Sequence, residues 1–212
     1  ITDTEKPVKP VLADVIAECS ATVAVPSTTD NCKGTVTGTT ADPLSYTAQG
    51  TYTITWSFDD GNGNIETALQ KVIIKDTQKP VITCPVDINQ VAEANQCGAT
   101  VSIVNPTATD NCSTTFTFTG VRSDSKLLTD LYPVGKTTIV WTATDASGNT
   151  SASCEQIITI TDTEKPVKPV LADVIAECSA TVAVPSTTDN CKGTVTGTTA
   201  DPLSYTAQGT YT

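Results

Sequence analysis

Residues 160–212 repeat residues 1–53 without a single difference, from Ile-Thr-Asp-Thr-Glu-Lys-Pro at the start to Gly-Thr-Tyr-Thr at the end. A catalytic domain gains little from an identical partial duplicate, whereas a stalk or fibre gains length from every unit that is added. We therefore expect an architectural protein, and we expect this chain to be one stretch of a longer array.

A shorter signal, Asp-Thr-x-Lys-Pro, subdivides the repeat and occurs at residues 3–7, 76–80 and 162–166. The intervals between its copies are 73 and 86 residues, and each suits one small domain. The two intervals are distant relatives, because Thr-Asp-Asn-Cys occurs in both, at 29–32 and at 109–112. The sequence thus predicts three modules: residues 1–76, residues 77–161, and a truncated copy of the first over residues 162–212.

Each module has the pattern of a set of short strands. Thr, Val and Ile are frequent, Gly and Pro interrupt them, and no apolar stripe of helical period has a useful length. Residues 51–58 alternate, with Trp56 on the apolar face and Thr or Ser on the other, and residues 136–143 repeat the pattern around Trp141. Several short strands in so few residues predict an all-β protein of tandem immunoglobulin-like β-sandwich modules arranged end to end.

The formal net charge of −11 argues against nucleic acid as a partner, because its phosphates would repel the chain. The chain contains no histidine, which excludes Ser-His-Asp and Cys-His catalytic arrangements. Adjacent acids such as Asp59 and Asp60 are expected to be solvated turn residues rather than a catalytic pair. No segment approaches the roughly 18 apolar residues that cross a bilayer. We expect a non-enzymatic protein without a membrane span.

Eight cysteines, without histidine and without a Cys-x-x-Cys motif, favour disulfide bonds and an oxidising compartment. Zinc is the alternative, but Cys spacings of 13 and 15 residues lack the paired-ligand signature of structural zinc sites.

A comparison of the modules predicts the pairing of the cysteines. Cys84 and Cys154 of the second module align with the apolar Val11 and Leu69 of the first. Because the two cysteines are missing together, we expect one buried bridge that the first module replaces by a hydrophobic contact. The other cysteines then form local pairs, each contributing roughly 3 kcal/mol to so small a domain. The predicted disulfides are Cys19–Cys32, Cys84–Cys154, Cys97–Cys112 and Cys178–Cys191.

The second module carries a combination of motifs that resembles the hyalin repeat (HYR) domain. They are Val-Ile-Thr-Cys-Pro-Val-Asp-Ile from residue 81, Gln-Cys-Gly-Ala-Thr-Val from 96, Pro-Thr-Ala-Thr-Asp-Asn-Cys from 106, Tyr-Pro-Val-Gly-Lys-Thr-Thr from 132, and Thr-Asp-Ala-Ser-Gly-Asn from 144, with Cys154. The first and third modules resemble the HYR-like variant that lacks one disulfide, and the first departs from the full pattern at Val11 and Leu69.

The resemblance implies an immunoglobulin-like fold and a role in extracellular adhesion. Long HYR-like arrays are typical of giant surface adhesins of gliding Bacteroidetes, which the type IX secretion system exports. The resemblance therefore implies a secreted bacterial protein at the cell surface, acting in adhesion or gliding. The expected partners are neighbouring repeats of the same chain, with a surface or glycan ligand bound through other parts of the protein.

A carbohydrate-binding immunoglobulin-like module is the alternative function. Such modules often present planar aromatic side chains to sugars, but Trp56 and Trp141 fall on the apolar faces of their strands and are expected in the core. The remaining candidates for sugar stacking are Tyr46, Tyr132 and Tyr205, one in each module near a turn.

The linkers are short, and the proline in each fixes φ and stiffens the joint, so we expect an extended stalk. In an immunoglobulin-like sandwich, the linker, the loop after the second strand and the loop after the sixth meet at one pole. Acids and amides occur in all three segments, and calcium takes six to eight oxygen ligands of these kinds. The sequence therefore predicts calcium at the module junctions.

The candidate ligands form one set for each module. In the second module the principal ones are Asp76, Asp110 and Asp145, and in the first Asp3, Asp30 and Asp60 take their places. Each loop taken alone is also explained by the preference of Asp, Asn and Gly for turns, which stays open as the alternative. The full candidate set is Asp3, Glu5, Asp30, Asn31, Asp60, Asn62, Asn64, Asp76, Asp110, Asn111, Asp145, Asn149, Asp162, Glu164, Asp189 and Asn190.

Overall fold

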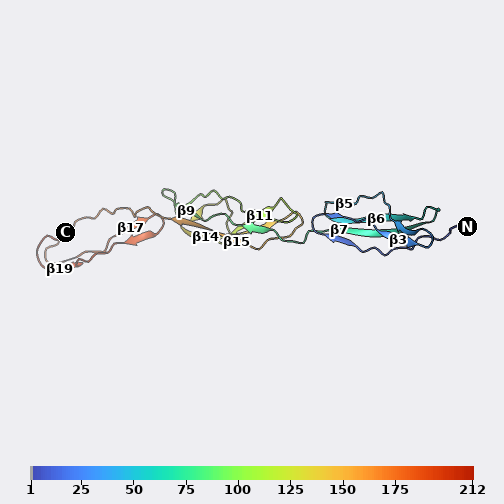
Figure 1. Ribbon diagram of the computed structural model, residues 1–212. Helices are drawn as coiled ribbons and strands as arrows, with labels where there is room; N and C mark the ends of the chain where they lie inside the picture. The colour runs from blue at the N-terminus through green and yellow to red at the C-terminus, as the bar shows by residue number, and fades with distance from the viewer. Residues whose placement is uncertain (1) are drawn as a thin grey trace. The chain divides into compact units, whose positions relative to one another are not determined.

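The computed structural model describes residues 2–212, which form nineteen strands and no helix. Figure 1 draws the strands as arrows along the chain. The all-β prediction is therefore confirmed. Within the described residues, no helix is long and apolar enough to cross a membrane. The chain divides into two compact units: Ile1–Thr83 with Thr107–Phe118 and Thr142–Ser153, and Cys84–Pro106 with Thr119–Trp141 and Cys154–Thr212. The module boundaries drawn from the repeat spacing stay a prediction.

The first unit is built on its two longest strands, β6 (Gly50–Asp59) and β7 (Ile65–Ile74), which pair antiparallel over their whole length. Strand β1 (Val15–Ala17) adds to the other edge of β7 in parallel. The remaining strands of the unit form short antiparallel pairs. These are β2 (Ala21–Thr22) with β5 (Ser45–Tyr46), β3 (Ser27–Asp30) with β4 (Gly34–Thr37), and β8 (Val81–Thr83) with β11 (Thr107–Thr109).

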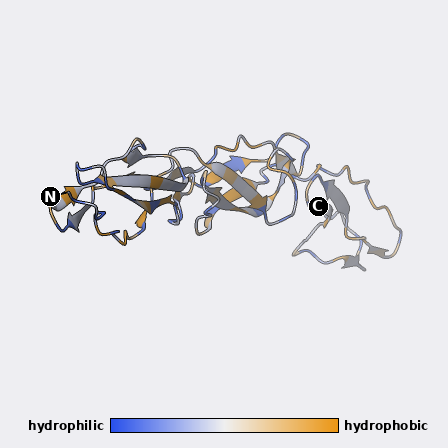
Figure 2. Ribbon diagram, turned by 90° about the vertical axis from the view of Figure 1, so that its right-hand side faces the viewer, coloured by the Kyte–Doolittle hydropathy of each residue, from blue (hydrophilic) through white to orange (hydrophobic). Residues whose placement is uncertain are grey.

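One hydrophobic core lies between the β6–β7 sheet and the short pairs β2–β5 and β3–β4. The predicted alternation along 51–58 is confirmed, because Ile54, Trp56 and Phe58 are completely buried, whereas Thr53 and Thr55 are exposed and Ser57 is only partly buried. In Figure 2 the long strands carry apolar segments between paler polar ones. The buried members of the core are Val23, Val36, Tyr46, Ile54, Trp56, Phe58, Ala68, Val72 and Ile74.

The second unit centres on a four-stranded sheet in the order β12-β14-β15-β9. Its strands are β9 (Ile88–Val91), β12 (Thr117–Arg122), β14 (Gly135–Thr144) and β15 (Cys154–Thr161), and β9 runs parallel to β15. Three antiparallel pairs complete it: β10 (Gly98–Ala99) with β13 (Tyr132–Pro133), β16 (Ala180–Thr181) with β19 (Ser204–Tyr205), and β17 (Ser186–Asp189) with β18 (Gly193–Thr196).

Each tryptophan in the core is paired with a glutamine on the next strand. The indole nitrogen of Trp141 donates to Oε1 of Gln156 at 3.3 Å, and the amide of Gln156 donates to the carbonyl of Val86 at 2.8 Å. Trp56 and Gln70 repeat the arrangement at 3.0 Å. Both indoles are buried, as the alternation predicted, and neither offers a surface on which a sugar could stack.

Three of the four predicted disulfides are wrong. Cys84–Cys154 is confirmed, with 5.8 Å between the Cα atoms, but Cys19 is bonded to Cys112 rather than to Cys32. Cys112 is therefore not available for the predicted Cys97–Cys112 bond. Cys178–Cys191 is not formed either, and both of these sulfurs are free thiols.

The length of β6 explains why the local pairing Cys19–Cys32 fails. Cys19 lies at the start of β6, where Gln49 donates to the carbonyl of Glu18 at 3.0 Å. Cys32 lies at the other end, where the ammonium of Lys33 donates to the carbonyl of Asp59 at 2.9 Å. A strand of this length extends about 30 Å, whereas a disulfide joins Cα atoms less than about 7 Å apart. Cys191 instead lies against the loop of Cys97, where its sulfur contacts the carbonyl of Gln96 at 3.6 Å.

The hydrophobic contact expected between Val11 and Leu69 is also absent. Val11 is 100% exposed and Leu69 66% exposed. Strand register gives the reason, because Cys154 pairs with Trp141 where Ala68 pairs with Trp56. The buried counterpart of Cys154 is therefore Ala68, and Leu69 lies one residue beyond the matching position.

The two identical copies of residues 1–53 differ in structure, and the difference isolates what the β6–β7 hairpin contributes. Val36 is 1% exposed in the first copy, whereas its counterpart Val195 is only partly buried. Strand β1 also has no counterpart at residues 174–176, where Ile175 is 94% exposed. Strand β1 pairs with β7, and the 212 residues contain no second β7, so pairing rather than local sequence makes this strand.

Replacing Gln156 by alanine should lower the free energy of unfolding by about 1–3 kcal/mol or more, because the buried indole N–H of Trp141 loses its acceptor. Glu155→Ala is the matched control, since that side chain is adjacent, exposed and on the opposite face of β15. Urea denaturation followed by tryptophan fluorescence measures both. Equal losses in the two variants would contradict the role given to Gln156.

Extending the chain after Thr212 with the sequence of residues 54–75 should convert residues 174–176 into a strand, because it supplies the missing counterpart of β7. Slowed hydrogen exchange at Val174 to Ala176 is the expected result. The control extension ends at the counterpart of Asp59 and so adds β6 alone, which should leave these amides exchanging freely. Protection that is equal in the two extensions would show that β7 is not the cause.

Candidate metal centre

Three aspartates of the first unit, Asp76, Asp110 and Asp145, each place a carboxylate oxygen within 4.8 Å of the others. They come from three separate segments: the linker after β7, the loop after β11 and the loop after β14. A second group of the same kind is formed by Asp3, Asp30 and Asp60. The structure therefore brings together the two principal triads that the sequence predicted.

The loop after β14 is folded around the carboxylate of Asp145. Its Oδ1 accepts hydrogen bonds from the backbone amides of Ser147 and Asn149, both at 2.8 Å, and its Oδ2 accepts from the Asn149 side chain at 2.9 Å. Gly148 permits this tight turn because its φ of 88° is a conformation that other residues rarely adopt. Asn149 thus acts as a scaffold, with its amide nitrogen directed at Asp145.

Asp110 and Asp76 each use one carboxylate oxygen for the local turn. Oδ1 of Asp110 accepts from the amides of Cys112 and Ser113, both at 2.9 Å, and Oδ1 of Asp76 accepts from the amide of Gln78 at 3.1 Å. Their Oδ2 atoms are buried and have no hydrogen-bond partner. A buried carboxylate oxygen without a partner is costly, which points to a ligand that the two atoms share.

The triad of the first module, formed by Asp3, Asp30 and Asp60, repeats this geometry. Asp30 accepts from the amides of Cys32 and Lys33 at 2.9 and 2.8 Å, and its Oδ2 is buried without a partner. Asp60 accepts from the Asn64 side chain at 2.7 Å, and that side chain also donates to the carbonyl of Asp3 at 3.3 Å. Asn62 donates to Oδ2 of Asp3 at 3.4 Å, so the side-chain nitrogens of both asparagines in this loop are directed at the linker and loop acids.

The loop aspartates of both triads favour the ionised state. Burial acts to raise the pKa of Asp145, but hydrogen bonds from Asn149 and Ser147 outweigh it and lower the pKa below its ordinary value. Burial and the hydrogen bonds from Asn64 and Asn62 have the same two effects on Asp60, whose pKa is also lowered. Both carboxylates are therefore negatively charged at neutral pH, as metal ligands have to be.

Other residues of the candidate set lie outside the two triads. The amide of Asn31 donates to Glu5 at 2.6 Å and that of Asn190 to Glu164 at 2.9 Å, so these acids and amides satisfy each other at the surface. Asn111 is exposed. In the last module, Asp189 is buried and accepts from the amide of Cys191 at 3.0 Å, and Asp162 accepts from Glu164 at 3.0 Å, but the counterpart of Asp60 falls beyond residue 212.

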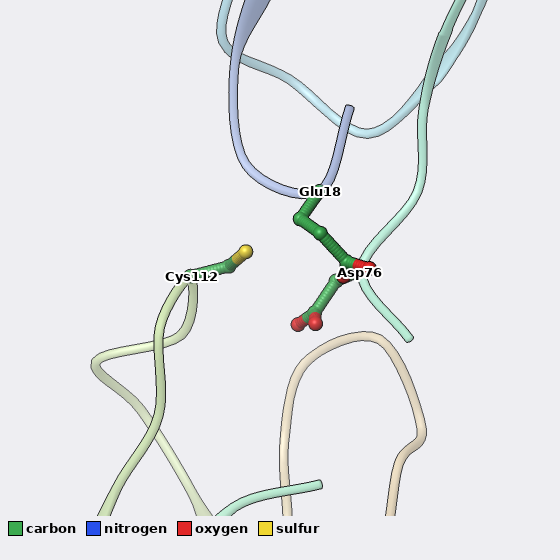
Figure 3. A group of neighbouring side chains, drawn as sticks. All are labelled: Glu18, Asp76 and Cys112. Carbon is green, nitrogen blue, oxygen red and sulfur yellow. The ribbon is translucent and has the colours of Figure 1, made fainter. Parts of the chain in front are cut away.

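Glu18, Asp76 and Cys112 form a third cluster, in which the sulfur of Cys112 points toward the two carboxylates (Figure 3). This cluster is structural, because Cys112 is bonded to Cys19 and has no thiolate to offer. Both oxygens of Glu18 are also occupied, by the amide and the hydroxyl of Thr77 at 2.8 Å each. These hydrogen bonds from Thr77 lower the pKa of Glu18 and keep it charged.

Sequence reasoning missed the residues that attach the linker to the first module. The amide of Asp76 donates to Oε1 of Gln49 at 2.7 Å, and Gln49 in turn donates to the carbonyl of Glu18. Thr77 completes the attachment through Glu18. The sequence signal for this attachment was the threonine found in all three copies of Asp-Thr-x-Lys-Pro, because no predicted role accounted for its hydroxyl group.

Comparison with known proteins gives a consistent picture. Residues 75–160 match the model of the HYR domain, as the resemblance of the second module predicted. "Hyalin" from Strongylocentrotus purpuratus is 33% identical over 168 residues, covering 77% of this chain and 12% of hyalin. "Sushi, von Willebrand factor type A, EGF and pentraxin domain-containing protein 1" from Rattus norvegicus is 37% identical over 106 residues, covering 50% of this chain and 3% of that protein. The chain thus spans only a small part of these relatives.

Among solved structures, human protocadherin-24 EC1-2 form II resembles 74% of this chain, and the match covers 98% of the protocadherin chain. The TM-score is 0.34 and the identity 12%, a likeness too low to bear on function.

The Cys19–Cys112 bond can be mapped directly. Cleavage before aspartate leaves every cysteine on its own peptide, and Cys112 lies on 110–123. The peptides 14–29 and 173–188 are identical, so a Ser179→Thr substitution at an exposed position marks the second by mass. Without reduction, 110–123 should be linked to the unmarked peptide that carries Cys19. A link to 87–109, which carries Cys97, would restore the local pairing and contradict the structure.

Proposed function

We propose that the chain is a non-catalytic structural segment of an extended extracellular adhesin, in which calcium and disulfide bonds fix the joints between repeats. The observation that carries the proposal is the recurrence of one joint. A linker aspartate meets two further aspartates from separate segments, and this geometry occurs twice in the described residues. A cell-surface location, export from a bacterium and a part in gliding remain expectations from the sequence resemblance.

Calcium suits the dimensions of the triads. Ca²⁺ holds oxygens at about 2.3–2.6 Å, so two ligands on opposite sides of one ion lie about 4.6–5.2 Å apart. The carboxylate oxygens of each triad lie within 4.8 Å of one another, which one central ion can span. The unpartnered oxygens of Asp76 and Asp110 would then have a ligand in common.

The chemistry of the ligand set favours calcium over softer metals. Within the described residues the two triads offer only carboxylates, and the chain contains no histidine. Zinc prefers nitrogen and sulfur ligands, whereas calcium accepts carboxylates, carbonyls and water in flexible geometry. Three negative charges this close together repel each other when no cation is bound. A bound ion would offset this repulsion and so stabilise the folded joint.

An ion at Asp76 would act on the joint rather than on one domain alone. Asp76 is 3% exposed and is bound through its amide to Gln49 and through its carbonyl to the Asn149 side chain at 3.3 Å. Coordination of its carboxylate together with Asp110 and Asp145 would fix the linker to the loops after β11 and β14. A joint of this kind transmits tension and resists bending, which is what a stalk requires.

Four of the five aromatic residues considered for the carbohydrate-binding alternative are unsuited to stacking on a sugar, and the fifth, Tyr205, is partly buried with its ring centroid 4.3 Å from that of Tyr211. Trp56, Trp141 and Tyr132 are at most 1% exposed, and Tyr46 is 8% exposed. The ring of Tyr132 is covered by the Arg122 guanidinium at 3.7 Å. An aromatic platform for a sugar needs an open ring face, and these four residues do not provide one.

Calorimetric titration of the oxidised chain with calcium at pH 7 should give two sites per chain, one for each triad. Asp110→Asn should remove one site, because the amide keeps the turn hydrogen bonds but loses the charge. The variant should also lose the increase in melting temperature that calcium gives to the second module.

Asp14→Asn is the matched control, since it removes the same charge from an exposed residue outside both triads. It should retain both sites. The proposal fails if calcium releases or absorbs no heat with the unmodified chain, or if the two variants bind it equally.

A further inference from the structure

Cys97 and Cys191 are free thiols that face each other in the second unit. The sulfur of Cys97 contacts the carbonyl of Asn190 at 2.7 Å, and the sulfur of Cys191 contacts the carbonyl of Gln96 at 3.6 Å. Each sulfur therefore lies against the residue that precedes the other cysteine. The side chain of Asn190 also donates to the carbonyl of Gln96 at 3.5 Å, which ties the two loops together.

The positions of these cysteines match those of the bonded pair Cys19–Cys112. Cys19 follows β1, the parallel partner of β7, and Cys97 follows β9, the parallel partner of β15. On the other side, the amide of Cys112 donates to Oδ1 of Asp110 at 2.9 Å, and the amide of Cys191 donates to Oδ1 of Asp189 at 3.0 Å. Both pairs thus join the segment after a parallel edge strand to an aspartate turn.

We infer that Cys97 and Cys191 form a disulfide bond, equivalent to Cys19–Cys112, so that successive joints of the repeat are each closed by one covalent bridge. The inference does not depend on calcium binding. It also accounts for the free cysteines of the chain: Cys32 stands at the position of Cys112, and Cys178 at the position of Cys19. In an array that continues with the same repeat, Cys178 would bond to the counterpart of Cys112.

The local environment supports a close approach of the two sulfurs. A hydrogen bond with the Cys97 thiol, together with burial and the charge of Asp162, raises the pKa of Cys191 to about 12. A linker aspartate is likewise beside Cys112, where Asp76 belongs to the same cluster. The loop of Cys97 is also tied to this linker, because the amide of Asn95 donates to Glu164 at 2.8 Å.

Formation of the bond needs a disulfide oxidant, for which oxidised glutathione serves. The thiolate of Cys97 attacks one glutathione sulfur and expels the other half as a thiolate. Cys191, after losing its proton to water, then attacks the Cys97 sulfur of the mixed disulfide and expels the second glutathione. Two protein thiols thus lose two electrons and two protons, and one glutathione disulfide becomes two glutathione thiols.

The test is peptide mapping of the full chain after oxidation in a glutathione buffer and blocking of the remaining thiols. Cleavage before aspartate places Cys97 on 87–109 and Cys191 on 189–200, which is identical to the Cys32 peptide 30–41. A Thr194→Ser substitution, at an exposed position, marks 189–200 by mass. The expected product is 87–109 linked to the marked peptide, with two blocked thiols per chain, at Cys32 and Cys178.

Two matched variants separate this bond from its competitors. Cys191→Ser should raise the number of blocked thiols from two to three by releasing Cys97, whereas Cys178→Ser should lower it to one and leave the 87–109 link intact. A link from 87–109 to the unmarked peptide, a link between 173–188 and 189–200, or four blocked thiols in the oxidised parent chain would each overturn the inference.

Discussion

The linker aspartate Asp76 is the residue on which the joint depends. Its amide is held by Gln49, its carbonyl by Asn149, and one carboxylate oxygen by the amide of Gln78. The other oxygen is buried without a hydrogen-bond partner beside Asp110 and Asp145. Because the polar groups of one linker residue are used by segments before and after it, the linker is part of the folded structure. The Cys19–Cys112 bond and the contact of Glu18 with Thr77 reinforce the same point.

Much of the fold followed from the sequence, because alternation reports burial directly. Threonine and serine alternate with Ile54, Trp56 and Phe58, and strand β6 buries the apolar set completely. The triads also followed, since acids in three segments of an immunoglobulin-like sandwich meet at one pole whatever the details of each loop. Gln70 and Gln156 could not be foreseen, because a glutamine becomes an indole partner only through strand register. The two copies of residues 1–53 show the same limit, since one sequence forms strand β1 only where β7 is present.

The disulfides mark the place where sequence comparison gave the wrong answer. Cys19 and Cys32 are close in the chain, and a disulfide that closes a short loop is a common way to stabilise a small domain. The length of β6 separates them, however, and a cysteine of the next repeat unit lies nearer in space. In an array of repeats, the nearest partner of a terminal loop belongs to the neighbouring unit. Sequence distance therefore misleads most at the joints, where calcium is also proposed to bind.

The central claim is that calcium and the linker aspartate hold the joint in one orientation. Residual dipolar couplings of the oxidised 212-residue chain test it most directly, with backbone amides of residues 4–75 and 77–160 fitted separately in calcium and in chelator. The account predicts one common alignment tensor in calcium and two diverging tensors after chelation. Two different tensors in calcium, or one common tensor in both conditions, would contradict it.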